Sequence, residues 1–442
     1  MKKEKYGLFT AIAMIVGIVI GSGIFFKSDN ILVATGGSVF LGVIVFILSA
    51  VSIIFGSLCI SELAARTSRA GGIISYAEEF AGEKVACGFG WFQLFVYYPI
   101  LVAVIGWVVG IYFCILFNIE QKLLTQVLIG LGFIVFSYTV NVLSAKLGGI
   151  LQNAATVIKL IPLAVIAISG VFLGSPAEGF KNISTQTFAG TAWIAAVGPI
   201  AFSFDGWIVS TSIAHEIKDS KRNLPKALVI APLFILCAYV LYFLGITSFV
   251  GVENVMSMGD SHVYFAAERL FGAFGAKLMV IFVLLSVMGT ENGLILGYIR
   301  LPYSLALRGM VPMSKQLSVE SKRLGLSVFS ALFSFAISCF WLMIHYITIR
   351  FNLMENSDIS EVAIVISYIM YVVLYYKVWR LYKAGEIKSG FRGIVSPLLA
   401  ATGSAFILYG GLHNPLFIVY LSLLHICRLR RKKMGWSYRS AL

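Results

Sequence analysis

The stretch from Leu8 to Ala34 reads LFTAIAMIVGIVIGSGIFFKSDNILVA, and it is apolar and long enough to cross a membrane, which takes about 20 mostly apolar residues in a helix. Its centre carries the triplet Gly21-Ser22-Gly23, whose residues have modest or low helix propensity. Backbone that is not helical is tolerated at membrane depth only where protein or a water-filled cavity surrounds it. The triplet therefore predicts a helix that is broken near the middle of the membrane. Close packing of another helix against the two glycines is the alternative.

The composition of the whole chain is that of a membrane protein. Hydrophobic residues make up 59% of the 442 residues, and Asp, Glu, Lys and Arg together make up 12%, against roughly 25% in a soluble domain. We therefore predict an all-α membrane protein in which residues 1–442 form a single integral membrane domain. Apolar runs predict twelve transmembrane helices, near residues 8–34, 38–64, 86–117, 123–142, 147–173, 189–214, 226–250, 276–305, 325–347, 361–379, 394–411 and 413–427.

The positive charges predict the orientation of these helices. The net charge is +14, and twelve helices put both termini on one side of the membrane. Nearly all Lys and Arg residues fall on that side, which the positive-inside rule identifies as the cytoplasmic side. The exceptions are Lys27, Lys122, Lys181, Arg269, Lys277 and Arg350 on the other side and Lys159 within a helix. We expect a multi-pass protein of the cell membrane with both termini in the cytoplasm.

Three further features of the sequence exclude other classes of protein. The basic tail at residues 428–433 is expected to contact anionic lipids at the cytoplasmic face, and no nucleic acid. The lysines at positions 2, 3 and 5 resemble the start of a signal peptide, but the apolar run behind them is too long, so we expect it to stay in the protein. The six cysteines lie in or beside apolar runs and predict no disulfide framework, and no metal-binding or phosphate-binding motif occurs, so neither a metal ion nor a cofactor is expected.

A second transmembrane segment carries the same kind of interruption. In residues 189–214, Pro199 is followed by Phe204-Asp205-Gly206, which puts a carboxylate at membrane depth. This break lies about 184 residues after the first, and each break opens a set of five predicted helices. Paired interruptions in two halves predict an inverted repeat with a substrate site at the interface of the repeats. We place the repeats at residues 8–173 and 189–379, and two extra helices within residues 394–427.

Two broken helices supply the groups that a zwitterion needs. The free amide N–H groups and the positive dipole end of one half-helix attract a carboxylate, and the free carbonyls of another attract an ammonium group. A small α-amino acid carries both of these charges. The two breaks therefore predict a site for an amino acid.

Three ionisable residues, Lys159, Asp205 and Glu291, lie inside predicted helices, where a functional or paired role is the default. Lys159 lies about a dozen residues beyond the preceding lysine, which is too deep for a lysine that reaches the membrane surface from a helix end. Asp205 either binds the substrate amine or caps the half-helix that follows it, through the N–H groups of Ile208 or Val209. Glu291 either forms a pair within the protein, for which Lys159 is a partner, or exchanges a proton.

Several motifs together resemble the amino acid, polyamine and organocation transporters, and most of all the L-type neutral amino acid exchangers and their bacterial relatives. These motifs are IGSGIF at residues 20–25, FSFDGW at 202–207, EIK at 216–218 and RNLP at 222–225, followed by Asn292-Gly293. The similarity runs from about residue 7 to residue 312, with agreement in hydropathy beyond it. It implies a ten-helix inverted repeat of the bacterial leucine-transporter type plus two further helices.

The resemblance also implies roles for the residues at the breaks. Backbone N–H groups at residues 22–24 are implied to hold the substrate carboxylate, and carbonyls at Val19, Phe202 and Asp205 to hold its amino group. The Phe202 ring is implied to close the site from outside. Lys159 corresponds to the family lysine that replaces the sodium ion of sodium-coupled relatives, which implies sodium-independent transport. The substrate-binding residues that we expect are Val19, Gly21, Ser22, Gly23, Ile24, Phe202, Phe204, Asp205, Gly206 and Asn292.

The sequence departs from the family pattern at several points. Ser68 and Ile74 stand where the family commonly has a proline and a tyrosine, in a loop expected to contribute to the inner gate. Residues 118–122 contain no cysteine, whereas heteromeric animal members use one there to join a glycoprotein, and Cys114 lies within the apolar run before it. No disulfide-linked heavy-chain partner is therefore expected. Glu291 stands where an apolar residue is usual.

We therefore expect a sodium-independent transporter of neutral L-amino acids that works by alternating access as an exchanger. The pocket expected for the substrate side chain contains no fixed charge, which favours a neutral side chain; its residues are Ser22, Tyr97, Tyr98, Phe202, Ile208 and Asn292. Because Asp205 leaves room for a cationic side chain, a carrier of cationic amino acids or polyamines stays open, as does a proton-coupled amino acid symporter. An enzyme would need Asp205 and Glu291 to reach one substrate, and a channel would need repeated carbonyl or charge rings, so neither is expected.

Overall fold

The computed structural model describes residues 7–21, 23–67, 72–143, 158–175, 192–208, 217–321, 323–354, 357–412 and 417 of the chain. These residues form helices and no strand, and an isolated antiparallel bridge joins Ser321 to Leu326. The predicted all-α class is therefore confirmed for the described part of the chain.

The helices follow one another along almost the whole described chain, and three of them are only four or five residues long. The α-helices up to the second break are α1 (Leu8–Val19), α2 (Gly23–Phe26), α3 (Ser28–Ala34), α4 (Val39–Ala64), α5 (Gly72–Tyr76), α6 (Glu83–Phe92), α7 (Tyr98–Leu116), α8 (Leu123–Leu143), α10 (Leu160–Leu173) and α13 (Val197–Ser203). The later ones are α14 (Ser220–Val250), α15 (Val252–Met258), α16 (His262–Tyr298), α17 (Leu301–Leu307), α18 (Ser314–Leu317), α19 (Val328–Arg350), α20 (Ile359–Lys383) and α21 (Ser396–Gly411).

Eight helical stretches among the described residues are long and apolar enough to cross a membrane. They are Val39–Ala64, Glu83–Leu116, Leu123–Leu143, Arg222–Val250, Val252–Leu307, Val328–Arg350, Ile359–Lys383 and Phe391–Gly411. Leu160–Leu173 and Ala192–Ser203 are shorter apolar helices, and most of the helix predicted at 413–427 lies outside the described residues. The chain thus has the helices of a multi-pass membrane protein, while the count of twelve and the inverted repeat stay predictions.

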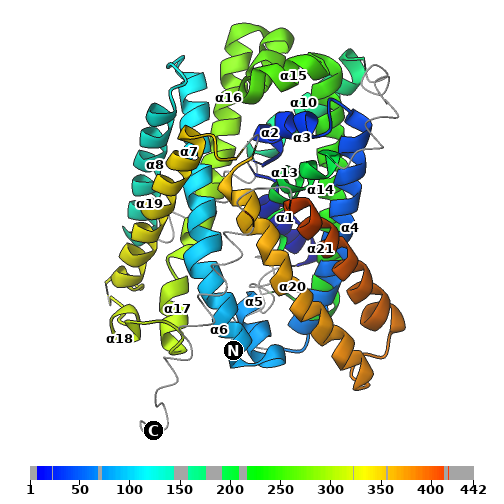
Figure 1. Cartoon of the computed structure of the whole chain (residues 1–442), viewed down its shortest axis with the longest axis vertical. Coiled ribbons are helices and arrows are strands. Elements are labelled where there is room, and N and C mark those ends of the chain that lie inside the picture. Colours follow the sequence, from blue (N-terminus) through cyan, green and yellow to red (C-terminus); the bar gives the residue numbers. More distant parts are fainter. Residues whose placement is uncertain are drawn as a thin grey trace.

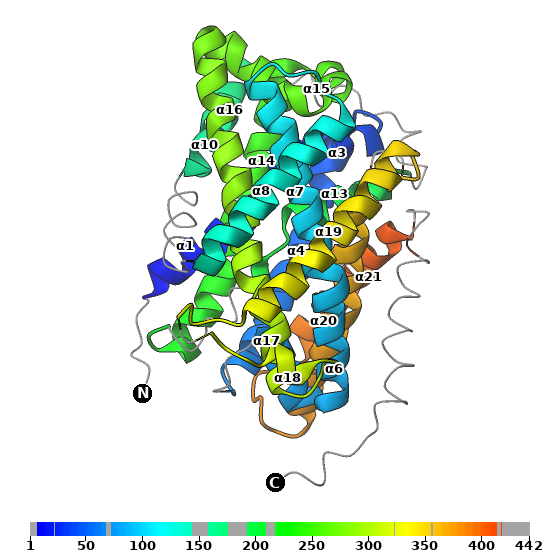
Figure 2. The same cartoon turned by 90° about the vertical axis from the view of Figure 1, so that its left-hand side faces the viewer.

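The long helices form two groups with the broken helices between them. In one group, α7 packs against α8, α16 and α19, and Figure 2 shows α7, α8 and α19 facing the viewer. In the other, α14 packs against α1, α4 and α10, and α21 packs against α4 and α20. The short helix α13 packs against α2, α4 and α20, so it lies inside the molecule (Figure 1).

Both predicted breaks are present in the described residues. The helix α1 ends at Val19, Ile20 takes an extended conformation with φ −69° and ψ 99°, and helical structure resumes at Gly23. The second break follows Ser203, and Gly206 has φ +95°, a conformation that residues with a side chain rarely adopt. Ser22 itself lies outside the described residues. The glycine triplet and the Phe204-Asp205-Gly206 motif therefore interrupt their helices as the sequence predicts.

Candidate substrate site

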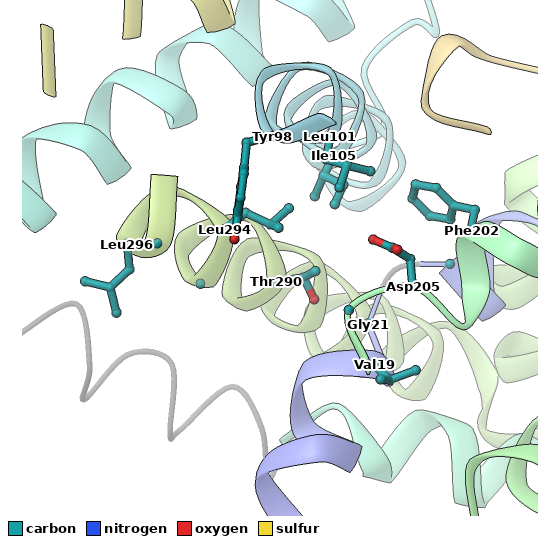
Figure 3. Close-up of a pocket in the computed structure, with 14 residues that line it drawn as sticks. Val19, Gly21, Tyr98, Leu101, Ile105, Phe202, Asp205, Thr290, Leu294 and Leu296 are labelled. Carbon is teal, nitrogen blue, oxygen red and sulfur yellow. The ribbon is translucent and has the colours of Figure 1, made fainter. Parts of the chain in front are cut away.

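A cavity of about 220 Å³ lies where the two broken helices face α7 and α16 (Figure 3). The two breaks contribute Val19, Gly21, Gly23, Phe202, Asp205 and Gly206. The long helices contribute Tyr98, Leu101 and Ile105 from α7 and Thr290, Gly293, Leu294, Leu296 and Gly297 from α16. Six of the residues predicted to bind substrate are thus brought together around one space.

The two breaks touch each other through a glycine. A Cβ atom built on Gly23 would lie 2.7 Å from the Cα of Ser203 and 3.0 Å from the Cδ1 of Phe202. These separations are too short for a real side chain, so only glycine lets α2 approach α13 this closely. Gly23 therefore sets the distance between the two half-helices that line the cavity.

A tyrosine from α14 joins the ends of the two helices that stop at the breaks. The Tyr239 hydroxyl lies 3.0 Å from the carbonyl oxygen of Val19 and 2.8 Å from that of Ser203. Both carbonyls belong to the last turn of a helix, so no N–H group of the same helix donates to them. Because a hydroxyl has one proton, it donates to one of these carbonyls at a time.

The carboxylate of Asp205 points into the cavity (Figure 3). It accepts a hydrogen bond of 2.5 Å from the hydroxyl of Tyr97, which comes from the π-helical segment Gln93–Tyr97 that precedes α7. The backbone N–H of Asp205 donates to the carbonyl oxygen of Phe202 at 3.0 Å, which closes the turn at the end of α13. The cavity therefore has one carboxylate on its wall, held in place by a tyrosine.

Lys159 lies just before α10 and its side chain is completely buried. Its ammonium group donates a hydrogen bond to the carbonyl oxygen of Gly17 in the last turn of α1. A lysine that reached the membrane surface would not be buried in this way, so that alternative is wrong. The structure places the Lys159 amine at the carbonyl end of the first broken helix, where the negative end of the helix dipole lies.

Three of the other four predicted substrate-binding residues do not line the cavity. Ile24 and Phe204 are buried, and the Phe204 ring packs against the rings of Phe46 and Tyr239. The side-chain oxygen of Asn292 accepts a 2.7 Å hydrogen bond from Asn141 of α8. The fourth, Ser22, lies outside the described residues.

Glu291 does not form the pair with Lys159 that the sequence suggested. Its side chain is fully buried, and neither carboxylate oxygen has a hydrogen-bond partner among the residues that the structure describes. It lies against α7, since a Cβ atom on Gly106 would be 3.1 Å from its Oε1. Because neither Glu291 oxygen contacts the Lys159 amine, which donates to Gly17, the prediction that these two residues pair is wrong. Glu291 also does not line the cavity that holds Asp205, so the two carboxylates do not form the paired site that an enzyme would need.

Sequence reasoning missed the contributions of α16, of Leu101 and Ile105, and of Tyr239. The cavity-lining positions Thr290, Gly293, Leu294 and Gly297 recur at the spacing of three and four residues that defines one face of a helix. That spacing, together with the small residues Gly293 and Gly297, was a usable signal. For Leu101, Ile105 and Tyr239 the sequence holds no signal that separates them from other buried apolar or aromatic residues.

Comparison with known proteins agrees with this geometry. The sequence model of the family described as amino acid permease matches residues 6–421. The serine/threonine exchanger SteT of Bacillus subtilis is 26% identical over 411 residues, which is 92% of this chain and 90% of that protein. The b(0,+)-type amino acid transporter 1 of Mus musculus is 31% identical over 72% of this chain and 66% of its own length.

A third relative has the same kind of function. The large neutral amino acids transporter small subunit 2 of Rattus norvegicus is 29% identical over 70% of this chain and 59% of its own length. All three relatives are transporters, and this chain is accordingly no enzyme. It belongs to the amino acid permease family, within the superfamily of amino acid, polyamine and organocation transporters.

Proposed function

We propose that this protein exchanges neutral L-amino acids across the cell membrane by alternating access and independently of sodium. The observation that supports this most is the cavity between the two helix breaks, which offers backbone groups of both polarities to one small molecule. The family membership supports an amino acid as the substrate.

Each end of a zwitterion has a binding surface at the breaks. The N–H groups at the start of α2, around Gly23, have no partner within that helix and are suited to the substrate carboxylate. Near them lie the carbonyls of Val19 and Ser203, which share one tyrosine hydroxyl. A substrate ammonium group carries three protons, so it supplies the donors that these carbonyls lack, and the Asp205 carboxylate adds an attractive charge.

The rest of the cavity favours a neutral side chain. Leu101, Ile105 and Leu294 give it an apolar wall, and Tyr98 and Thr290 add hydroxyl groups. A volume of about 220 Å³ is small compared with pockets for larger ligands, which begin at about 300 Å³. We infer a substrate with a small or medium neutral side chain.

Lys159 supports independence from sodium. Its ammonium group already occupies the carbonyl end of α1 at Gly17, where a metal cation would otherwise stabilise the free carbonyl groups. With this fixed charge in place, no sodium ion is needed for the same electrostatic role.

The distribution of basic residues supports an orientation with both termini in the cytoplasm. In that orientation, the end of the molecule that holds α2, α3 and α15 faces outward, and the end that holds α5, α17 and α18 faces inward (Figure 1). The Phe202 ring then lies on the outer side of the cavity. Cys114 is buried within α7, which supports the absence of a disulfide-linked partner subunit.

Purified protein in proteoliposomes tests this proposal, with internal amino acid, sodium and the proton gradient varied one at a time. We expect uptake of labelled serine, threonine or a larger neutral amino acid only when the vesicles contain amino acid. Replacing sodium with choline should leave the rate unchanged. Uptake into empty vesicles that rises with an imposed proton gradient would show a symporter instead.

The carboxylate on the cavity wall favours a second candidate, a carrier of cationic amino acids or polyamines. Competition of lysine and putrescine against a neutral amino acid tests it in the wild type and in Asp205→Asn. For the neutral exchanger, neither cation competes in either protein. Competition that is present in the wild type and lost in Asp205→Asn would establish the cationic carrier.

A further inference from the structure

A buried ion triad outside the cavity ties three separate helices together. Lys27 lies between α2 and α3, with its side chain 1% exposed. Its ammonium group lies 2.7 Å from Oδ2 of Asp358 and also donates to Oε1 of Glu361, at the start of α20. Lys27 is separated from the two carboxylates by more than 330 residues in sequence and meets them only in the fold.

Both carboxylates are held by further contacts. Oδ1 of Asp358 accepts the backbone N–H of Ser360 at 2.8 Å and so caps α20, and Oε2 of Glu361 accepts the hydroxyl of Ser357 at 2.7 Å. Glu361 also rests against α13, since a Cβ atom on Gly198 would lie 2.6 Å from its Oε2. The carboxylates therefore form a rigid acceptor for Lys27, and α2, α13 and α20 meet at this point.

Lys27 also lies against the ring that covers the substrate cavity. Its ammonium nitrogen is 5.4 Å from the centre of the Phe202 ring, within the range of a cation–π contact. Phe202 itself lines the cavity. Lys27 therefore connects the carboxylates of α20 with the aromatic wall of the substrate site.

The triad lies beside a groove, so its charges can separate without being left where water is excluded. A groove of about 520 Å³ on the other side of the triad is lined by Asn30, Gly198, Ser357 and Glu361, among others. Buried ion pairs add little net stability, because removing the charges from water offsets their attraction. Such a pair does favour the one geometry in which the charges meet, and here the neighbouring groove lets water reach Glu361 once the lysine and the carboxylates separate.

We propose that Lys27 is a positioning residue of the transport cycle, which holds the outer part of the first broken helix and the Phe202 ring closed over the substrate. The triad forms when the cavity is shut from outside and separates when it opens to the outside. This inference rests on the proposed transport function and its orientation. A merely static role, in which the triad stays closed in every state, is the competing explanation.

Access of a thiol reagent to the cavity tests the proposal without a transport measurement. A reporter cysteine replaces Ile105, which lines the cavity, in a chain whose six natural cysteines have been removed. A membrane-impermeant maleimide is applied from the Lys27 side in proteoliposomes of known orientation. We expect Lys27→Gln to raise the labelling rate about tenfold, because two carboxylates without their cation disfavour the closed geometry. Lys27→Arg, which keeps the charge, should stay near the rate of the parent.

A surface ion pair provides the matched control. Lys122 pairs with Glu120 at 2.7 Å in an exposed position, so Lys122→Gln should leave the labelling rate unchanged. If Lys27→Gln does not fold, Lys27→Gln/Glu361→Gln tests the same point, because it also removes one of the unpaired carboxylates. We expect the same increase in labelling from that variant.

Two results would overturn the proposal. One is an unchanged labelling rate in folded Lys27→Gln or in the double variant, and the other is an equal increase from both sides of the membrane, which indicates general loosening. A chain that gives the expected one-sided increase but transports no amino acid would refute the proposed function and leave the role of Lys27 intact.

Discussion

Single residues determine the shape of the cavity, and Gly23 is the position that least tolerates a side chain. Its position is fixed by contact with the backbone of Ser203 and the ring of Phe202, so any side chain there must push α2 away from α13. Asp205 and Lys159 act differently, since each places an ionisable side chain at a break. At this scale the site depends on one steric requirement and two electrostatic ones.

The substitution Gly23→Val tests the steric requirement. Overpacking of this kind costs about 1–3 kcal/mol, and here it acts on the binding geometry, so we expect affinity for the amino acid to fall at least about tenfold. The protein should stay folded and monodisperse in detergent, because the strain is confined to the contact between α2 and α13. Equilibrium binding of labelled substrate measures the effect. Gly132→Val is the control, since a Cβ atom at Gly132 would have no neighbouring atom within 4 Å. Wild-type affinity in Gly23→Val would contradict the proposed substrate site.

Substitutions of Glu291 show how a buried carboxyl group, with no partner among the described residues, affects the stability of a membrane protein. An ionised carboxylate with neither oxygen bonded is strongly unfavourable at this depth, so we expect the neutral form. Glu291→Gln should then keep the melting temperature, and Glu291→Leu should raise the free energy of unfolding by about 1 kcal/mol or more. Thermal unfolding in detergent measures the effects of both Glu291 substitutions. Glu361→Gln, which removes a partner of Lys27, should lower the free energy of unfolding. A marked loss of stability in Glu291→Gln would reveal an ionic partner of Glu291. An unchanged pH dependence of transport in the same variant would contradict the hypothesis that Glu291 exchanges a proton.

At the scale of elements, the broken helices are held at their ends by side chains from other helices. Lys159 holds α1 at Gly17, and Tyr239 of α14 holds both α1 and α13. The outer segment between α2 and α3 is held by α20 through Lys27. Short helices with unsatisfied ends are not stable by themselves, so these contacts are what keep the breaks in place.

Removal of the shared hydroxyl tests this account of the breaks. Tyr239→Phe leaves two buried carbonyls without their donor, and the loss of such a hydrogen bond is worth about 0.5–1.5 kcal/mol. We expect KM for the amino acid to rise about three- to tenfold, with a smaller change in kcat. Tyr242→Phe on the same helix is the matched control, because the Tyr242 hydroxyl has no hydrogen-bond partner in the described structure. Equal effects of the two substitutions would show that Tyr239 acts only through packing.

At the scale of the whole molecule, two groups of long helices enclose the broken ones, so the substrate site lies inside protein and away from lipid (Figure 1). This satisfies the condition under which non-helical backbone is tolerated at membrane depth. In the proposed alternating-access cycle, one group of helices would move relative to the other to expose this site.

The orientation of the whole molecule has its own test. Basic residues predict that the loop at Lys388, between α20 and α21, faces the cytoplasm and that Glu120, after α7, faces outward. In a cysteine-free chain, we expect Glu120→Cys to react with an impermeant maleimide in intact cells. Lys388→Cys should react only after permeabilisation, and the reverse pattern would invert the proposed topology.

The breaks and Lys159 could be predicted because each violates a local rule of membrane helices, and a local violation is visible in sequence. Asn292 was placed on the wrong face of α16. Successive residues turn by about 100° in a helix, so Asn292 points almost opposite to Thr290, which lines the cavity. Lys27 looked like an ordinary flanking lysine, because its partner Asp358 lies 331 residues away and only the fold brings them together.

The hydroxyl that Tyr239 divides between Val19 and Ser203 has a consequence for the return step of the carrier. One proton serves two acceptors, so an unloaded site always lacks a donor, and only water can supply it. When the empty site closes, this water must either stay bound inside it or be removed. When a loaded site closes, the ammonium group of the substrate supplies the missing hydrogen-bond donor. An unloaded carrier should therefore face a higher barrier to reorientation than a loaded one, and this asymmetry would favour the proposed exchange of one amino acid for another over an empty return.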